Sequence, residues 1–323
     1  MGICLPCRLF NKWWMLVTVN LILATSAATY EVNSPVSATA GYHLWDGIPE
    51  ISVQVGPDII SATPDTSLSH STLLPSIATA IHLKESTGPN QSVQLIDQKI
   101  DAKISSLPSL VIGNSVIKQI PVALINTLGL LSPQRSNRPD GPSLWLGNDF
   151  LEAYQIVIDP AHSIFELMDP RNTLPSGKGV VTVPFTLKNG QIHIDVVVAG
   201  KKPYSAILAT SAPVTLLPLS VVDTSKLPST DRFPVVLPDG SKGMVSSVSP
   251  DWVGIGGAKV LNPTMLTTPS TQQGKIVPFT PVVGMDFLSH FRVTIDYASK
   301  KMTLQSLTAI SAAPSNKMSG SKH

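Results

Sequence analysis

Two short triplets carry the residues of this chain that could do acid–base chemistry. The first is Asp65-Thr66-Ser67, and the second is Ala209-Thr210-Ser211. A carboxyl group can take up and release a proton during a reaction, whereas a methyl group can do neither. The triplets therefore predict one acid–base candidate, Asp65, and a matching position, Ala209, that lacks the acid.

Both triplets belong to a longer internal repeat, which is the first pattern to seek in a chain of this length. The segment Leu146-Gly147-Asn148-Asp149-Phe150-Leu151 follows the first triplet, and Val283-Gly284-Met285-Asp286-Phe287-Leu288 follows the second. Gly147 comes 82 residues after Asp65, and Gly284 comes 75 residues after Ala209. Two landmarks in the same order at similar separation indicate an internal duplication in which each copy is a large lobe.

Short strands and turns are expected to position the triplets. Residues 51–55 alternate between apolar and polar, as a half-buried strand does, and residues 59–63 form a second strand that leads into Asp65. The other expected elements are strands at 110–112, 116–124, 181–185, 252–255 and 259–261, and a short helix within 73–83. Turn residues at 87–90 and 238–240 predict one hairpin in each copy.

Composition narrows the class of protein. The 323 residues carry a net charge of +2 without a basic cluster, which argues against nucleic-acid binding. Frequent proline (28 residues) and the lack of long amphipathic helical patterns favour strands and loops. The seven histidines lack metal-ligand spacing, so we expect no metal and no cofactor.

The first 28 residues read as a secretory signal peptide. Arg8 and Lys12 precede an apolar run at 13–24, and small residues follow at 25–28. A membrane anchor is less favoured, because the run is shorter than the roughly 20 residues that span a bilayer. Cys4 and Cys7 both lie in this segment, so the mature chain is expected to lack disulfides and to be secreted or periplasmic.

On these residues, each copy resembles a lobe of the retropepsin-like (pepsin-type) aspartic peptidases. A lobe of that family has an Asp-Thr-Gly turn after a strand, then a hairpin flap, then two apolar residues and a glycine that support the Asp loop. Gly147 and Gly284 match the supporting glycine, and the hairpins near Gly88 and Gly240 match the flaps. The resemblance covers roughly 45–307 and implies an all-β fold with two tandem retropepsin-like acid-protease lobes in a pseudo-twofold bilobal unit.

The resemblance also says what the triplets would do. In the family, two aspartates share one proton and activate a water molecule between them. Asp65 matches the first aspartate and Ala209 stands where the second belongs, so Asp65 is expected to titrate more nearly as an ordinary acid. Thr66 and Thr210 match the threonine that hydrogen-bonds across the lobe interface.

Three positions depart from the family pattern. Ser67 and Ser211 replace the glycine of the turn, which implies a loop of another shape or a less open floor. Pro64 removes a backbone donor just before Asp65.

Other acids favour structural roles. Asp223 begins a second Asp-Thr-Ser triplet, which we interpret as a turn or a helix cap. Asp149 and Asp286 lie in the two supporting segments, and Asp159 and Asp296 end strands before turns.

These features give a domain organisation and three hypotheses. The expected segments are a signal peptide at 1–28, a linker at 29–44, lobe 1 at 45–171, a linker at 172–180, lobe 2 at 181–309 and a disordered tail at 310–323. The favoured function is a secreted aspartic-peptidase homologue with impaired catalysis that binds peptide or protein in the inter-lobe cleft, as a monomer. The alternatives are an active aspartic endopeptidase in which Asp65 pairs with its twin in a homodimer, and a structural, envelope-associated β protein without a ligand cleft.

Overall fold

The structure is a computed structural model that describes residues 37–84, 87–125, 141–221, 232–236, 242–269 and 279–307. The expected signal peptide, the tail and the Asp223 triplet lie outside these residues, as does most of the loop before Gly141. Within the described ranges, no helix is long and apolar enough to cross a membrane. The all-β class predicted from the sequence is confirmed, since strands make up nearly every element.

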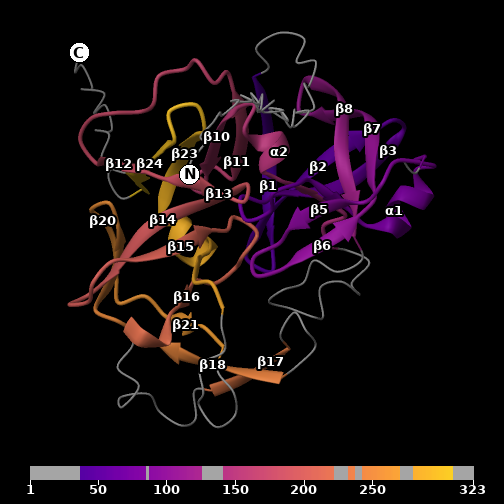
Figure 1. Cartoon of the computed structure of the whole chain (residues 1–323). Coiled ribbons are helices and arrows are strands. Elements are labelled where there is room, and N and C mark those ends of the chain that lie inside the picture. Colours follow the sequence, from indigo (N-terminus) through magenta and orange to yellow (C-terminus); the bar gives the residue numbers. More distant parts are fainter. Residues whose placement is uncertain are drawn as a thin grey trace, which may run out of the picture. The chain divides into compact units, whose positions relative to one another are not determined.

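The first lobe, residues 38–168, consists of strands with two short helices (Figure 1). Its elements are β1 (Ala38–Trp45), β2 (Ile48–Val55), β3 (Asp58–Pro64), β4 (Thr72–Leu73), α1 (Pro75–Ala80), β5 (Gln91–Gln94), β6 (Lys99–Ala102), β7 (Ile104–Ile112), β8 (Ser115–Leu124), β9 (Leu144–Leu146), α2 (Asn148–Leu151), β10 (Gln155–Asp159) and β11 (Ile164–Met168). Strands β1, β2, β3, β9, β4, β8 and β7 follow one another in a sheet, and β7 pairs back onto β2. This sheet therefore curls around the core of the lobe.

The second lobe, residues 180–307, also consists mainly of strands (Figure 1). Its elements are β12 (Val180–Pro184), β13 (Thr186–Lys188), β14 (Gln191–Val198), β15 (Tyr204–Leu208), β16 (Leu216–Leu217), η2 (Leu219–Val221), β17 (Arg232–Val236), β18 (Lys242–Val248), β19 (Trp252–Ile255), β20 (Ala258–Leu261), β21 (Met265–Thr267), β22 (Val282–Val283), α3 (Met285–Leu288), β23 (Phe291–Asp296) and β24 (Lys301–Ser306). The triplets follow β3 and β15, and each of these strands pairs in parallel with the strand before a supporting glycine, β9 or β22.

A shared sheet joins the lobes, in the order β1-β11-β10-β23-β24-β12. Strands β10 and β23 meet antiparallel at its centre, with Ile156 opposite Ile295 and Ile158 opposite Val293. Val157 faces Thr294 between these pairs. Because 156–158 corresponds to 293–295 in the sequence repeat, exchanging the copies exchanges the two outer pairs. The register thus places a local twofold relation at the centre of the sheet.

One expectation about the chain's organisation is wrong. The sequence predicts a linker over 29–44, yet its described last part is strand β1. Residues Ala38 to Gly41 pair with β11, and Tyr42 to Trp45 pair with β2. The segment looks like a loop because it is polar and contains Gly41, and its strand conformation comes from hydrogen-bonding partners on two other strands.

The hairpin of the first lobe also lies later than expected. The sequence places it at 87–90, whereas β5 and β6 pair from Gln91 to Ala102 and turn at residues 95–98. We call this hairpin the flap. In the second lobe β17 and β18 pair on either side of the expected turn, which itself lies outside the described residues. The expected helix within 73–83 is present as the shorter α1.

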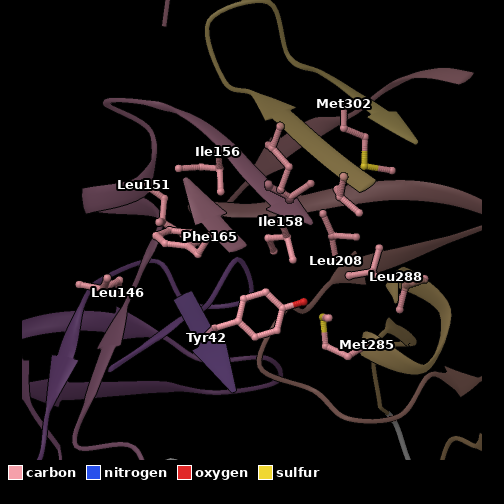
Figure 2. Packing of buried hydrophobic residues seen from close by; sticks show 14 of the residues in the cluster. Tyr42, Leu146, Leu151, Ile156, Ile158, Phe165, Leu208, Met285, Leu288 and Met302 are labelled. Atoms are coloured by element: carbon pink, nitrogen blue, oxygen red, sulfur yellow. The ribbon is translucent and has the colours of Figure 1, made fainter. Parts of the chain in front are cut away.

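Buried side chains from both lobes form one continuous hydrophobic core. Figure 2 shows part of it, with Tyr42, Leu146, Leu151, Ile156, Ile158 and Phe165 from the first lobe and Leu208, Met285, Leu288 and Met302 from the second. Burying one such large aliphatic or aromatic side chain contributes about 1.5–3 kcal/mol. The lobes are therefore joined by packing as well as by the shared sheet.

The supporting glycines sit where a side chain cannot fit. A Cβ atom on Gly147 would lie 2.4 Å from the carbonyl carbon of His70, and one on Gly284 would lie 2.7 Å from the carbonyl oxygen of Ala212. Both neighbours are backbone atoms that cannot swing aside. This close approach lets the segment after each glycine lie against the loop that follows each triplet.

We expect Gly147→Ala to lower the free energy of unfolding by about 1–3 kcal/mol or more, since it forces backbone atoms apart. Gly41→Ala is the matched control, because its new Cβ would have 4.0 Å to the nearest atom, the carbonyl oxygen of Ser163. Chemical denaturation of both variants checks this. Equal stability of Gly147→Ala and the wild-type protein would contradict it.

Candidate functional site

Each triplet loop is held by the supporting segment through the same set of hydrogen bonds. The Ser71 N–H and hydroxyl donate to Asp149 Oδ1 at 2.7 and 2.9 Å, and the Ser71 Oγ accepts from the Gly147 N–H at 3.0 Å. Thr215 makes the equivalent bonds to Asp286 and Gly284. Burial raises the pKa of Asp149 to about 7, although the hydrogen bonds from Ser71 act to lower it. Asp149 and Asp286 thus have the structural role that the sequence favours for them.

Thr66 and Thr210 join the two loops reciprocally. The Thr66 hydroxyl donates to the Leu208 carbonyl at 2.6 Å, and the Thr210 hydroxyl donates to the Pro64 carbonyl at 2.6 Å. Each hydroxyl oxygen also accepts from the opposite threonine's N–H, at 3.2 and 3.3 Å. The expected contact across the lobe interface is confirmed. Pro64 does not disturb it, because the interface uses the carbonyl of Pro64 and not the missing N–H.

Asp65 is almost fully buried, with 3% of its surface exposed. Its Oδ1 accepts from the Ser67 N–H at 2.8 Å and from the Ser67 hydroxyl at 2.6 Å. The Ser211 hydroxyl of the second lobe also hydrogen-bonds to this carboxyl. The two serines that replace the family's glycines therefore both serve Asp65, one from each lobe.

Burial raises the pKa of Asp65 above its ordinary value, and the hydrogen bonds from Ser211 and Ser67 oppose that shift. The expectation that Asp65 titrates more nearly as an ordinary acid is therefore wrong. The missing partner removes one cause of a shift, the repulsion between two carboxylates, but desolvation supplies another. The burial of Asp65 could not be predicted from the sequence, because it depends on which other parts of the chain pack against the loop that carries this residue.

Ala209 has the backbone position that corresponds to Asp65. Its N–H donates to the Val283 carbonyl at 2.9 Å, as the Asp65 N–H donates to the Leu146 carbonyl at 2.8 Å. Ala209 is fully buried, and its apolar cluster contains Ile207, Ala212, Leu216 and Val282, with Val214, Leu266 and Phe279 packed against them. All of these residues belong to the second lobe. One residue of the first lobe completes the cluster, and it is Ile96 at the tip of the flap.

The flap tip is bound to the second lobe at three consecutive residues. The Leu95 carbonyl accepts from the Gln191 side-chain amide at 3.1 Å. Ile96 packs into the cluster around Ala209, and the Asp97 carboxyl accepts from the Thr280 N–H at 2.9 and 3.2 Å. The base of the flap rests on the first lobe, where the Gln94 N–H donates to the Ser69 hydroxyl at 2.9 Å. The flap is thus closed over the two triplets.

Solved structures of other proteins have a similar fold. The aspartic proteinase from Irpex lacteus superposes with a TM-score of 0.53 at 12% sequence identity, covering 86% of this chain and 99% of that one. The basic 7S globulin from soybean superposes with a TM-score of 0.50 at 11% identity, covering 85% of this chain and 96% of that one. The chain has a pepsin-like fold. No family model and no curated protein matches the sequence.

Two polar side chains add contacts to this pepsin-like fold that the sequence analysis missed. The Asn148 amide donates to the carbonyls of Thr66 and Leu68 in the first lobe and of Gly190 in the second, and its Oδ1 accepts from the Tyr297 hydroxyl at 2.6 Å. Gln191 donates to the carbonyls of Ser67 and Leu95. The repeat holds a signal for Asn148, because its counterpart Met285 is apolar in an otherwise similar buried segment.

The remaining candidates lie away from Asp65. The Asp159 and Asp296 carboxyls accept from the N–H groups of Ala161 and Ala298, so both close turns as the sequence predicts. Arg292 adds an ion pair to Asp159 at 3.2 Å. In the part of the chain that the structure describes, no three His, Cys, Asp or Glu side chains lie together as a metal site would require.

We expect Thr66→Val to lower the free energy of unfolding by about 1–3 kcal/mol, because it leaves the Leu208 carbonyl and the Thr210 N–H unpaired in a buried place. Thr66→Ser keeps the hydroxyl and is the matched control. Thr66→Val/Thr210→Val is expected to cost less than the sum of the single changes, since both threonines join the same two loops. Denaturant titration of the four variants measures this, and a fully additive cycle would argue against a reciprocal contact.

Proposed function

We propose that this chain is an exported pepsin-like protein that lacks peptidase activity and binds peptide or protein segments between its lobes. The observation that carries the proposal is the contact between Ile96 and the cluster around Ala209. In that place an aspartic peptidase needs a second carboxyl and room for water and substrate. Here the place holds a methyl group and a side chain of the flap.

The chemistry of Asp65 supports the loss of catalysis. A peptidase dyad needs one carboxyl that gives a proton and one that takes it, and the two must share a proton at working pH. The group that faces Asp65 from the second lobe is the Ser211 hydroxyl. A serine hydroxyl donates a hydrogen bond but does not titrate as an acid in this range, so it cannot replace the second acid, whose position is occupied by Ala209.

The flap supports a binding role. Residues 95–97 lie against the second lobe through a carbonyl, an aliphatic side chain and a carboxyl. A separate polypeptide segment that carries an aliphatic and an acidic residue can present the same groups. The site between the lobes therefore already accommodates a piece of polypeptide, although it is the chain's own.

The homodimer alternative requires a larger rearrangement. A second copy could bring its Asp65 to the first only by displacing the second lobe, which means breaking the threonine contacts and the pairing of β10 with β23. The monomer is therefore the favoured form of this proposal.

A structural β protein without a ligand cleft is a second candidate. The closed flap favours it, because the chain's own Ile96 joins the apolar cluster that contains Ala209. The two candidates differ in whether the flap gives way to a peptide. Failure of every peptide to bind, even after the flap tip is altered, would select the structural role.

We expect the purified protein to leave an unfolded substrate protein intact from acidic to neutral pH, because the partners of Asp65 among the described residues are serines and not a second acid. Asp65→Asn is the matched control, since it keeps the shape of the side chain and removes the acid. Mass spectrometry of the digests checks this. Cleavage that pepstatin blocks and Asp65→Asn abolishes would overturn the proposal, and loss of that activity on dilution would point to the homodimer.

Export is proposed from the charged start, apolar run and small residues of segment 1–28. We expect the mature protein isolated from its native cells to begin near residue 29 and to lie outside the cytoplasmic membrane. N-terminal sequencing of fractionated material measures this. A mature protein that retains Cys4 and Cys7 in a membrane fraction would support an anchor instead.

A further inference from the structure

The flap is a small hairpin whose position depends mainly on its contacts with the two lobes. Strands β5 and β6 pair only with each other within the described sheets. A two-stranded hairpin is marginal by itself in water. Its base packs on the first lobe through Val93, Leu95 and Ala102, next to Leu68, Ala123 and Ile125. Its tip depends on the second lobe.

The tip contacts have the form of a recognition motif. In order along the chain, they are a carbonyl that accepts from Gln191, an aliphatic side chain in the cluster around Ala209, and a carboxyl that accepts from the Thr280 N–H. The cluster itself is apolar and belongs to the second lobe except for Ile96. None of these contacts requires that the bound segment be part of a hairpin.

We propose that the second lobe is a binding site for peptides with a branched aliphatic residue followed directly by an acidic residue, and that Ile96-Asp97 of the flap is its internal ligand. The inference rests on the proposed binding function and names the class of segment that it serves. A free peptide enters when the flap tip leaves, and Ile96 blocks the site when no such peptide is present. The aliphatic residue supplies apolar burial, and the acid supplies the bond to Thr280.

The internal ligand weakens binding in a way that can be measured. A tethered segment competes at an effective concentration of millimolar order. The apparent affinity for a free peptide is therefore the intrinsic affinity multiplied by the fraction of molecules in which the tip is out. Removing the tip's aliphatic side chain should strengthen the binding of a free peptide without any change in the second lobe.

The test uses the full-length protein and a fluorescein-labelled peptide with the sequence of residues 92–99, Ser-Val-Gln-Leu-Ile-Asp-Gln-Lys. We expect Ile96→Ser protein to bind this peptide at least about ten-fold more tightly than wild-type protein, by fluorescence anisotropy. Ile59→Ser, on an exposed part of β3, is the matched control and should bind like the wild type. Peptides carrying Ile96→Ser or Asp97→Asn should bind more weakly to Ile96→Ser protein than the parent peptide does.

Equal binding of the parent and altered peptides, or no gain in Ile96→Ser protein, would overturn the inference. If thermal melting shows that Ile96→Ser protein is unfolded, Asp97→Ala protein takes its place, because Asp97 is exposed and its removal frees the tip from Thr280. The gain is then expected in that variant, and its absence would count against the inference.

Selecting a random peptide library on Ile96→Ser protein distinguishes the proposed binding function from the inferred aliphatic–acidic motif. Enrichment of aliphatic–acidic pairs supports the inference. Enrichment of another motif overturns it and leaves the proposed binding function standing. No enrichment overturns both, and favours the structural β protein.

Discussion

The reciprocal contact between Thr66 and Thr210 is the constraint on which the centre of this protein depends. Four hydrogen bonds link each threonine to the opposite threonine and to the strand end before it. All of these groups are buried, so their loss would leave polar atoms without water or partners. The contact therefore fixes the distance between the loops, and with it the positions of Asp65 and Ala209. Everything around it, from the supporting segments to the flap, packs against loops that are already joined.

Within that frame the two lobes play different chemical parts. The first lobe contributes a carboxyl that is buried and bonded to serines from both sides. The second lobe contributes an apolar cluster that contains Ala209. A dyad needs the lobes to be alike at this point, since each supplies one half of a proton-sharing pair. The contact between the two threonines holds Asp65 and Ala209 at the backbone positions of such a dyad, but only Asp65 carries a carboxyl group.

Features that depend on local pattern could be predicted from the sequence. Three kinds of residue recur at matched positions in the two copies: the supporting glycines, the aspartate that follows each of them, and the interface threonines. Each has the contacts expected for it. The alternating strand at 51–55 and the strand that leads into Asp65 are present as well. Patterns of this kind can be recognised in a sequence because their residues contact near neighbours or meet a requirement of the local backbone.

Features that depend on distant partners could not be predicted. Strand β1 is rich in small residues and contains a glycine, and only its pairing with β2 and β11 makes it a strand. The burial of Asp65 and its hydrogen bond from Ser211 of the other lobe likewise depend on parts of the chain far from the first triplet. Because a pKa follows burial and neighbours, the titration of Asp65 could not be read from the triplet alone.

The contacts of Asn148 and Gln191 show what a tandem chain can do that a symmetric dimer cannot. Asn148 corresponds to Met285 in the repeat, and Gln191 corresponds to Gly47, which has no side chain. In a homodimer, any residue added to one half appears in the other as well, and a change that suits one side must be tolerated twice. A chain with both halves in one polypeptide is released from that rule. It can keep one half polar and the other apolar, and can fasten one flap with a glutamine that the opposite side does not share.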